Sequence, residues 1–272
     1  MGVNALRFFS VFIVAQFISP ESVLAWGPGV HTVTALNALS NAETLLPSIA
    51  AIITSFPKEF IYGCLSADFF IGKGIGRNSS HPHDWNGGFC FLKGAGNDKE
   101  ASFSYGFLSH LAADVVAHNF LVPQLIKSHP ATGRLRHIYW EMRADYLMEA
   151  AYTSIARHIL SMDHVACDEL LNNMVEKRVP GLGVKKRIFT NSVYFSEYCH
   201  LTRELFFTVR PDSINRMNSY LTAMVEFSCR MVRDFLTNPY SSGCLNYSPI
   251  GKRDVHGSGR FRTLRNLFKP KK

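Results

Sequence analysis

Apolar residues recur at helical spacing along most of the chain, whereas the alternating pattern of a β-strand is nearly absent. Pro57 stands where a helix would begin, and the Pro-Asp-Ser sequence that starts at Pro211 is typical of a helix start. Residues 73–99 are rich in Gly, Asn and Ser, which predicts a long loop. Helices are predicted over residues 30–56 (as one helix or two), 57–70, 99–126, 134–161, 163–177, 185–207 and 210–236.

The predicted helices show no internal repeat and no domain boundary before a C-terminal tail. Hydrophobic residues make up 47% of the 272 positions and charged residues 18%, which excludes a largely disordered chain. A chain of this length can bury a sizeable core. The prediction is therefore a single all-α domain of several helices over residues 26–250, followed by a basic tail over residues 251–272.

The N-terminus has the layout of an export signal, with Arg7 before an apolar run of 11 residues. The small residues Val23 and Ala25 suit the positions that precede a signal-peptidase cut. A retained membrane anchor is the alternative, but the apolar run is shorter than the roughly 20 residues that a spanning helix needs. We therefore expect a signal peptide over residues 1–25 and an exported, periplasmic or secreted chain that begins at Trp26.

Removal of the signal peptide leaves the net charge at +8, because that segment holds one Arg and one Glu. A basic chain favours anionic lipid surfaces or nucleic acid and does not choose between them. The tail over residues 251–272 concentrates positive charge, with Phe and Leu interleaved, and suits either a surface-seeking segment or a solvated chain end. The six cysteines lack CxxC spacing, which argues against a thiolate zinc site, although some could pair in an oxidising compartment.

One predicted helix carries ionisable residues along a single edge. His110, Asp114 and His118 are spaced i, i+4 and i+8, and each step of four residues rotates by only about 40°. The next helix repeats the pairing with His137 and Glu141. Burial of unpaired carboxylates in such apolar helices is costly, and a bound divalent cation would remove that cost. Imidazoles and carboxylates without thiolates suit zinc in a catalytic site.

Three further segments carry groups of the same kind. Asp68 lies near the end of an apolar segment, and the predicted loop offers His81 or His83. His31 follows Trp26 by five residues, and cleavage would give Trp26 a free α-amine, which can chelate a metal together with its own carbonyl. Singly, these residues could be a helix cap, solvated loop histidines and a packed tryptophan. Together they predict a metal site built from the first half of the chain.

Five motifs between Trp26 and Asp145 resemble those of the exported zinc-dependent phospholipase C family of bacteria. Its superfamily also contains the fungal and plant single-strand-specific zinc nucleases. The resemblance implies an all-α fold of the phospholipase C and zinc nuclease type, with a metal cluster in a cleft between helices. The motifs are WGPGVH, SADFF, HPHDW, HLAADVVAH and HIYWE.

The resemblance implies three zinc ions per chain, of which the first two would share one carboxylate. The first zinc would bind Asp68, His110 and Asp114 together with His83, for which His81 is the alternative. The remaining ligands would be the amine and carbonyl of Trp26, His31 and the shared Asp114 for the second zinc, and His118, His137 and Glu141 for the third.

By this resemblance the chain is expected to be an exported zinc-dependent phosphodiesterase. It would be a phospholipase C that hydrolyses the glycerophosphate ester of phospholipids with zinc-activated hydroxide, and Asp68 would be both ligand and catalytic base. Asp145 and Asn119 are candidates to orient the metal-binding histidines. Phe69 replaces a tyrosine that contacts choline in the family, so choline specificity does not follow from the resemblance.

A phospholipid substrate or membrane surface is the expected partner, and no protein partner is implied. The first alternative is a nuclease-like enzyme whose substrate bases would stack on aromatic side chains such as Trp85, Phe89 and Trp140. A second is a His-Asp phosphohydrolase in which Asp84 would bind the metal. A third is a zinc-binding protein without catalysis.

Overall fold

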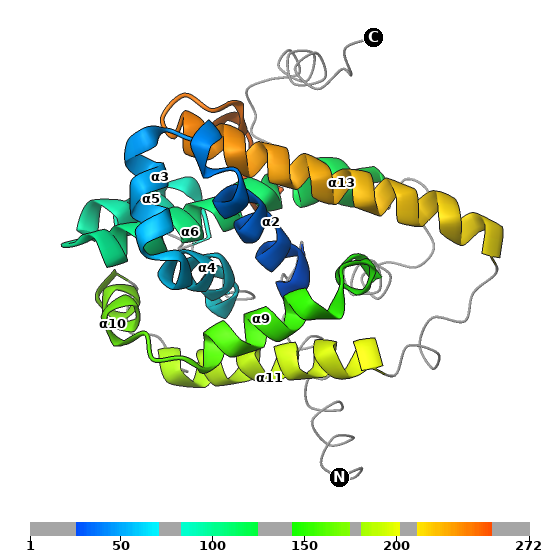
Figure 1. Cartoon of the computed structure of the whole chain (residues 1–272), viewed down its shortest axis with the longest axis horizontal. Coiled ribbons are helices and arrows are strands. Elements are labelled where there is room, and N and C mark those ends of the chain that lie inside the picture. The colour runs from blue at the N-terminus through cyan, green and yellow to red at the C-terminus, as the bar shows by residue number, and fades with distance from the viewer. Residues whose placement is uncertain (1–25, 71–82, 125–142, 175–180, 202–210, 252–272) are drawn as a thin grey trace.

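The computed structural model describes residues 26–70, 83–124, 143–174, 181–201 and 211–251, and all regular structure in these ranges is helical. The all-α prediction is thereby confirmed. The predicted signal peptide over residues 1–25 and the tail beyond Gly251 lie outside the described residues. The elements, in chain order (Figure 1), are α2 (Pro28–Ser40), η1 (Ala42–Thr44), α3 (Pro47–Ser55), α4 (Pro57–Ser66), η2 (Ala67–Phe70), α5 (Trp85–Gly94), α6 (Asp98–Val116), η3 (Ala117–Leu121), α9 (Ala150–Ser161), α10 (Val165–Met174), α11 (Leu182–Leu201), α13 (Pro211–Thr237) and η5 (Gly243–Asn246).

Local sequence signals account for several helix starts. Helices α2, α3 and α4 each have proline in the first turn, where its missing N–H leaves no hydrogen bond unmade. Helix α5 is capped by Asp84 and α6 by Asn97, whose side chains accept hydrogen bonds from Gly87 N and Glu100 N. The cap at Asp84 fixes the direction in which the chain enters α5.

Two predicted boundaries are wrong. The loop expected over residues 73–99 contains α5, because its glycines serve packing as well as turns: Gly88 lies directly against Leu108 of α6. The helix expected over residues 134–161 is broken, since residues 143–147 and α9 are separated by an extended residue at Glu149. The helix of the His110 stripe also changes type, because η3 is a π-helical turn that continues α6.

Helix α6 lies at the centre of the helical assembly, in contact with α4, α5 and α13. The backbones of α4 and α6 touch, since a Cβ on Gly63 would lie 2.0 Å from Phe103 O and one on Gly106 would lie 2.0 Å from Phe60 O. All residues of α6 from Gly106 to Val116 are buried. The ionisable residues of α6 therefore face other helices, not water.

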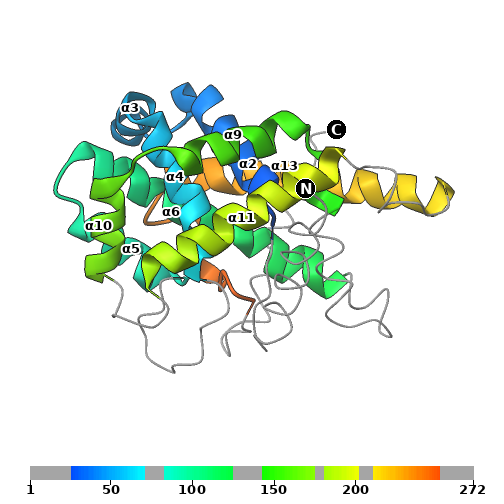
Figure 2. The ribbon, with the colours of Figure 1, turned by 90° about the horizontal axis from the view of Figure 1, so that it is seen from below.

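Helix α2 lies between α13 on one side and α9 on the other (Figure 1). From below, α9 and α11 run side by side (Figure 2). None of the described helices combines the length and the hydropathy that a bilayer-spanning helix needs.

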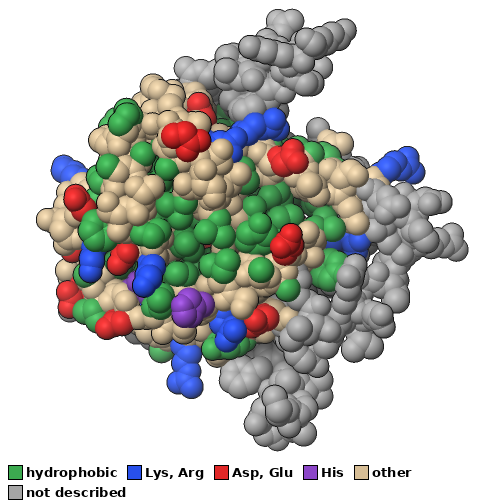
Figure 3. Space-filling model, viewed as in Figure 1, with side chains coloured by type: hydrophobic (Ala, Val, Ile, Leu, Met, Phe, Trp, Pro, Cys, Tyr) green, Lys and Arg blue, Asp and Glu red, His purple; other side chains and the backbone are tan. Residues whose placement is uncertain are grey.

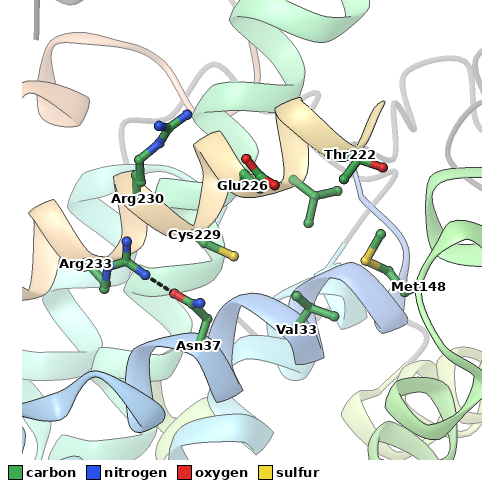
Figure 4. Close-up of a pocket in the computed structure, with 9 residues that line it drawn as sticks. Val33, Asn37, Met148, Thr222, Glu226, Cys229, Arg230 and Arg233 are labelled. Atoms are coloured by element: carbon green, nitrogen blue, oxygen red, sulfur yellow. Dashed lines mark hydrogen bonds between the residues drawn. The ribbon is translucent and has the colours of Figure 1, made fainter. Parts of the chain in front are cut away.

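A groove with a volume of about 410 Å³ runs between α2 and α13 (Figure 4). Its lining includes Val33 and Asn37 of α2 and Arg233 of α13, whose guanidinium donates to Asn37 Oδ1. Hydrophobic side chains gather across the middle of the same face, within a rim of charged ones (Figure 3). Val33 and Asn37 are rotated by about 200° and 240° from His31 around α2, so the groove and His31 lie on opposite sides of that helix.

Candidate metal centre

Three helical elements and the turn before α5 bring five predicted ligands to one buried place. Asp114 and His110 lie on α6, His31 on α2, Asp68 on η2, and His83 immediately before the cap of α5. All five side chains are buried, and Asp68 is the most exposed at 8%. Because α4 and α6 touch, the end of α4 and the following η2 lie beside the His110 turn.

Asp114 lies between three imidazoles. Its Oδ2 is 2.8 Å from Nε2 of His83 and 3.2 Å from Nε2 of His110, while its Oδ1 is 3.5 Å from Nε2 of His31. Oδ2 of Asp114 thus faces the rings of His83 and His110, while Oδ1 faces the ring of His31. This arrangement suits a carboxylate that bridges two cations.

His110 is oriented from its other side. Its Nδ1 lies 2.8 Å from the carbonyl oxygen of Cys64, which can only accept, so Nδ1 carries a proton. Nε2 then faces the carboxylates, 3.6 Å from Asp68 Oδ1. The ring stacks on His31 at a centroid distance of 3.8 Å and meets His83 edge-on at 4.9 Å. A backbone carbonyl that holds the second nitrogen is the usual support of a metal-binding histidine.

Burial and mutual charge set the protonation of the cluster. Burial and the neighbouring His110 lower the pKa of His31 well below its usual value, so His31 is neutral. Burial also lowers the pKa of His110, but Asp114 and Asp68 outweigh it and raise that pKa to about 9. Burial favours the neutral form of Asp114, but His110 and His83 hold its pKa well below the usual range. The carboxylate is therefore ionised at neutral pH.

Several buried ligand atoms of this cluster have no hydrogen-bond partner among the residues that the structure describes: both ring nitrogens of His31, Nε2 of His110 and Oδ1 of Asp114. Buried polar atoms without partners are rare and call for an explanation. Two groups of three residues each offer ligand atoms within 4.8 Å of one another, and His110 belongs to both. Their nitrogen and oxygen donors fit zinc. The groups are His31, Asp68 and His110, and His83, His110 and Asp114.

The grouping differs in one respect from the predicted ligand sets. His31 was expected to share a zinc with Trp26 and Asp114, whereas in the structure its ligand atom groups with those of Asp68 and His110. Nε2 of His31 nevertheless lies 3.5 Å from Asp114 Oδ1. This distance is similar to the 3.6 Å between Nε2 of His110 and Asp68 Oδ1.

The other predicted ligands are placed only in part. His118 is buried in the π-helical η3 and close enough to lower the pKa of His31, but it joins neither group. Trp26 is buried, and its indole Nε1 donates to Ala113 O at 3.2 Å, beside Asp114. His81, His137 and Glu141 lie outside the described residues.

Two contacts of the centre have no signal in the sequence pattern. The carbonyl oxygen of Cys64 orients His110, and because it is a backbone atom its role cannot be predicted from the residue type. Asp145, expected among the groups that orient the histidines, instead accepts a hydrogen bond from Val30 N at the start of α2. Asp84, the metal ligand of the His-Asp alternative, caps α5 and belongs to neither group of candidate ligands in the described part of the chain.

Comparison with known proteins agrees with this geometry. Residues 30–179, more than half of the chain, match the family described as zinc dependent phospholipase C. No curated protein and no solved structure gave a match. The matched region contains the whole buried cluster and confirms the resemblance seen in the motifs. The chain belongs to the zinc-dependent phospholipase C family.

Proposed function

We propose that the mature chain is an exported zinc-dependent phosphodiesterase that acts on phospholipids as a phospholipase C. The observation that carries the proposal is the ionised, buried carboxylate of Asp114 among three imidazoles, with ligand atoms that no group in the described part of the chain satisfies. The family match supports the same type of chemistry. Export is proposed from the sequence of residues 1–25.

Five of the proposed ligands fit a pair of zinc ions. Asp68, His83, His110 and Asp114 would hold the first, and Asp114 would reach the second with its other oxygen. His31 and the freed amine and carbonyl of Trp26 would complete the second. His118, His137 and Glu141 would hold a third, as the motif spacing suggests.

Zinc bound here would supply a water of lowered pKa and positive charge against a phosphodiester. The residues of the chain have separate tasks around it. Asp68 is more exposed than Asp114, so it is the carboxylate that can accept the proton of the attacking water. Cys64 O holds the His110 ring in place, and Asp114 stays ionised among the imidazoles. Water attacks phosphorus, the bond from phosphorus to the glycerol oxygen breaks, and that oxygen takes up a proton. Diacylglycerol and a phosphorylated headgroup are the products.

The aromatic side chains favour lipid over nucleic acid. Trp85 donates through Nε1 to Tyr247 O and stacks on Phe235, and Phe89 packs against the same Phe235 and Tyr240. Both rings are engaged with α13 and the segment after it, which leaves less of their surface for stacking with bases; Trp140 lies outside the described residues.

The headgroup is not fixed by these residues. Phe69, at the position of the family's choline-contacting tyrosine, is 4% exposed and packs edge-on against Phe189. Its ring is part of the core and offers nothing to a choline group.

The test uses secreted protein that starts at Trp26, loaded with zinc. It is assayed against vesicles of phosphatidylcholine, phosphatidylethanolamine and phosphatidylglycerol, and in parallel against single-stranded DNA. Diacylglycerol release that EDTA abolishes is the expected result. Asp114→Asn removes the negative charge and one of the two oxygens of a shared ligand, and should lower the rate by roughly 100-fold or more, because even the groups behind a ligand contribute 10–100-fold. Asp84→Asn is the control, since an asparagine here keeps an oxygen that can accept from Gly87 N and so keeps the cap beside His83.

Three outcomes would reject the proposal in different ways. Nucleotide release without diacylglycerol would identify a nuclease. Loss of zinc in Asp84→Asn, which keeps the cap on Gly87 N, would favour the His-Asp alternative. Full zinc loading without hydrolysis of any phosphodiester, including bis(p-nitrophenyl) phosphate, would identify a non-catalytic zinc protein.

A further inference from the structure

Asp145 lies flat against the backbone that precedes His31. A Cβ on Gly27 would be 2.5 Å from the Asp145 carboxyl carbon, and a Cβ on Gly29 would be 2.8 Å from its Oδ1. Real Cβ atoms do not come this close, so both positions must be glycine while the carboxylate stays where it is. The Gly-Pro-Gly sequence before Val30 is thus shaped to receive a side chain from a distant helix.

The same carboxylate completes the start of α2. Its Oδ1 accepts a hydrogen bond from Val30 N at 2.8 Å, and the side chain is 2% exposed. Helix α2 needs this bond, because its N-cap Gly27 has no side chain, Pro28 has no N–H, and its first turn has no acidic residue. A negative charge at this helix end is stabilised by the helix dipole.

The anchored segment lies between two proposed zinc ligands. Trp26 precedes Gly27, and His31 follows Val30. The other end of the segment is held by the Trp26 indole, which donates to Ala113 O next to the shared Asp114. Asp145 and Ala113 O therefore fix residues 26–31 at both ends.

We propose that Asp145 is a positioning residue that holds the mature N-terminus in place for metal binding. This inference rests on the proposed function, because it assumes that Trp26 and His31 share one zinc. Asp145 does not touch the ion. It sets the place of the Trp26 backbone and of His31 through Gly27, Gly29 and Val30.

The test compares three variants with the wild type, all secreted and confirmed to start at Trp26. Asp145→Ala removes the acceptor of Val30 N, whereas Asp145→Asn keeps an oxygen at that place. Gly29→Ala leaves Asp145 unchanged but places a methyl group where the Asp145 carboxylate lies, and so displaces that carboxylate. The matched control is Asp168→Ala, which breaks the hydrogen bonds of another carboxylate, to Tyr62 and Lys186, neither of which is a proposed ligand.

The measurements are zinc affinity against a competing chelator, zinc stoichiometry, and the rate at which a reagent acylates the Trp26 α-amine with and without zinc. Asp145→Ala and Gly29→Ala should weaken one zinc by about 10–100-fold and lose the zinc protection of the amine. Asp145→Asn should restore most of both. Asp168→Ala should lower the melting temperature and leave zinc binding and protection unchanged.

The outcomes separate the two proposals. The role of Asp145 would be overturned if the wild type binds zinc and both Asp145→Ala and Gly29→Ala keep its zinc affinity and amine protection. The proposed function would then still stand. A wild type that binds no zinc would overturn both. If Asp145→Ala does not fold, the comparison of Gly29→Ala with Asp145→Asn still decides.

Discussion

Nδ1 of His110 lies 2.8 Å from the backbone carbonyl oxygen of Cys64, and this contact decides which ring nitrogen faces Asp68 and Asp114. The contact depends on the backbone packing of α4 on α6 at Gly63, which is next to Cys64, and at Gly106, one turn before His110. The geometry of the metal centre is thus set by the central helix pair of the core.

The metal-free protein should lose stability between about pH 6.5 and pH 9. The pKa of His110 is raised to about 9 in the folded state, against an ordinary value of 6.5, so its contribution is full below pH 6.5 and is lost as the pH rises to 9. The expected loss of unfolding free energy is on the order of 3 kcal/mol, measured by urea denaturation after chelation. His110→Gln should lack this loss, and equal pH profiles for the two proteins would contradict the assignment.

Zinc binding at pH 7.5 should release a proton from His110. Below its raised pKa the ring of the metal-free protein is doubly protonated, and zinc replaces the proton on Nε2 while Nδ1 keeps its bond to Cys64 O. His31, neutral already, has no proton to give up. Calorimetric titrations in two buffers of different ionisation enthalpy measure the released protons. A smaller release in His110→Gln would identify the source, and identical values would exclude it.

Gly106→Ala should destabilise the fold by about 3 kcal/mol or more, because the added Cβ would lie 2.0 Å from Phe60 O and neither backbone can yield cheaply. Gly183→Ala is the control: nothing lies within 4 Å of its Cβ in α11. It should be neutral or stabilising by up to about 1 kcal/mol. Urea denaturation of both variants makes the comparison, and similar stabilities would show that the α4 and α6 backbones do not touch in this way.

Asn119→Ala should destabilise the turn that carries His118. The Asn119 side chain donates to Val115 O and to Ser248 O, both at 2.9 Å, and so ties η3 to the C-terminal segment. The loss should be about 1–2 kcal/mol, with one zinc bound about 10-fold more weakly if His118 is a ligand.

Asn246→Ala is the control for this variant, since Asn246 is exposed and donates to Gly243 O three residues before it. It should change stability by less than about 0.5 kcal/mol. Denaturation and chelator competition measure both effects. Unchanged zinc binding in Asn119→Ala together with reduced stability would show that the turn matters for folding alone.

Helical periodicity predicted the helices and the stripe of His110 and Asp114, because a spacing of four residues fixes one face of a helix whatever its surroundings. The same pattern failed at α5, where glycine serves close packing on α6. It also failed at Glu149, where the chain turns without proline or glycine.

Periodicity alone could not bring His31, Asp68 and His83 to α6, since these residues lie on separate elements far apart in the chain. Their motifs and the family resemblance suggested that these three residues lie close to α6. Only the folded structure shows that one oxygen of Asp114 faces His31 and the other faces His83. The contact of Asp145 with Gly27 also could not be predicted, because the sequence does not show which side chain packs against a glycine.

His110 belongs to both groups of candidate ligands, yet only its Nε2 is open, since Nδ1 is engaged by Cys64. A single nitrogen lone pair can serve one cation at a time. An ion that takes His110 in one group therefore leaves the other group with two of its three side chains: either His31 and Asp68, or His83 and Asp114. Two ions can occupy this centre together only if a further ligand, such as the Trp26 backbone in the proposed function, takes the place of His110 at one of them.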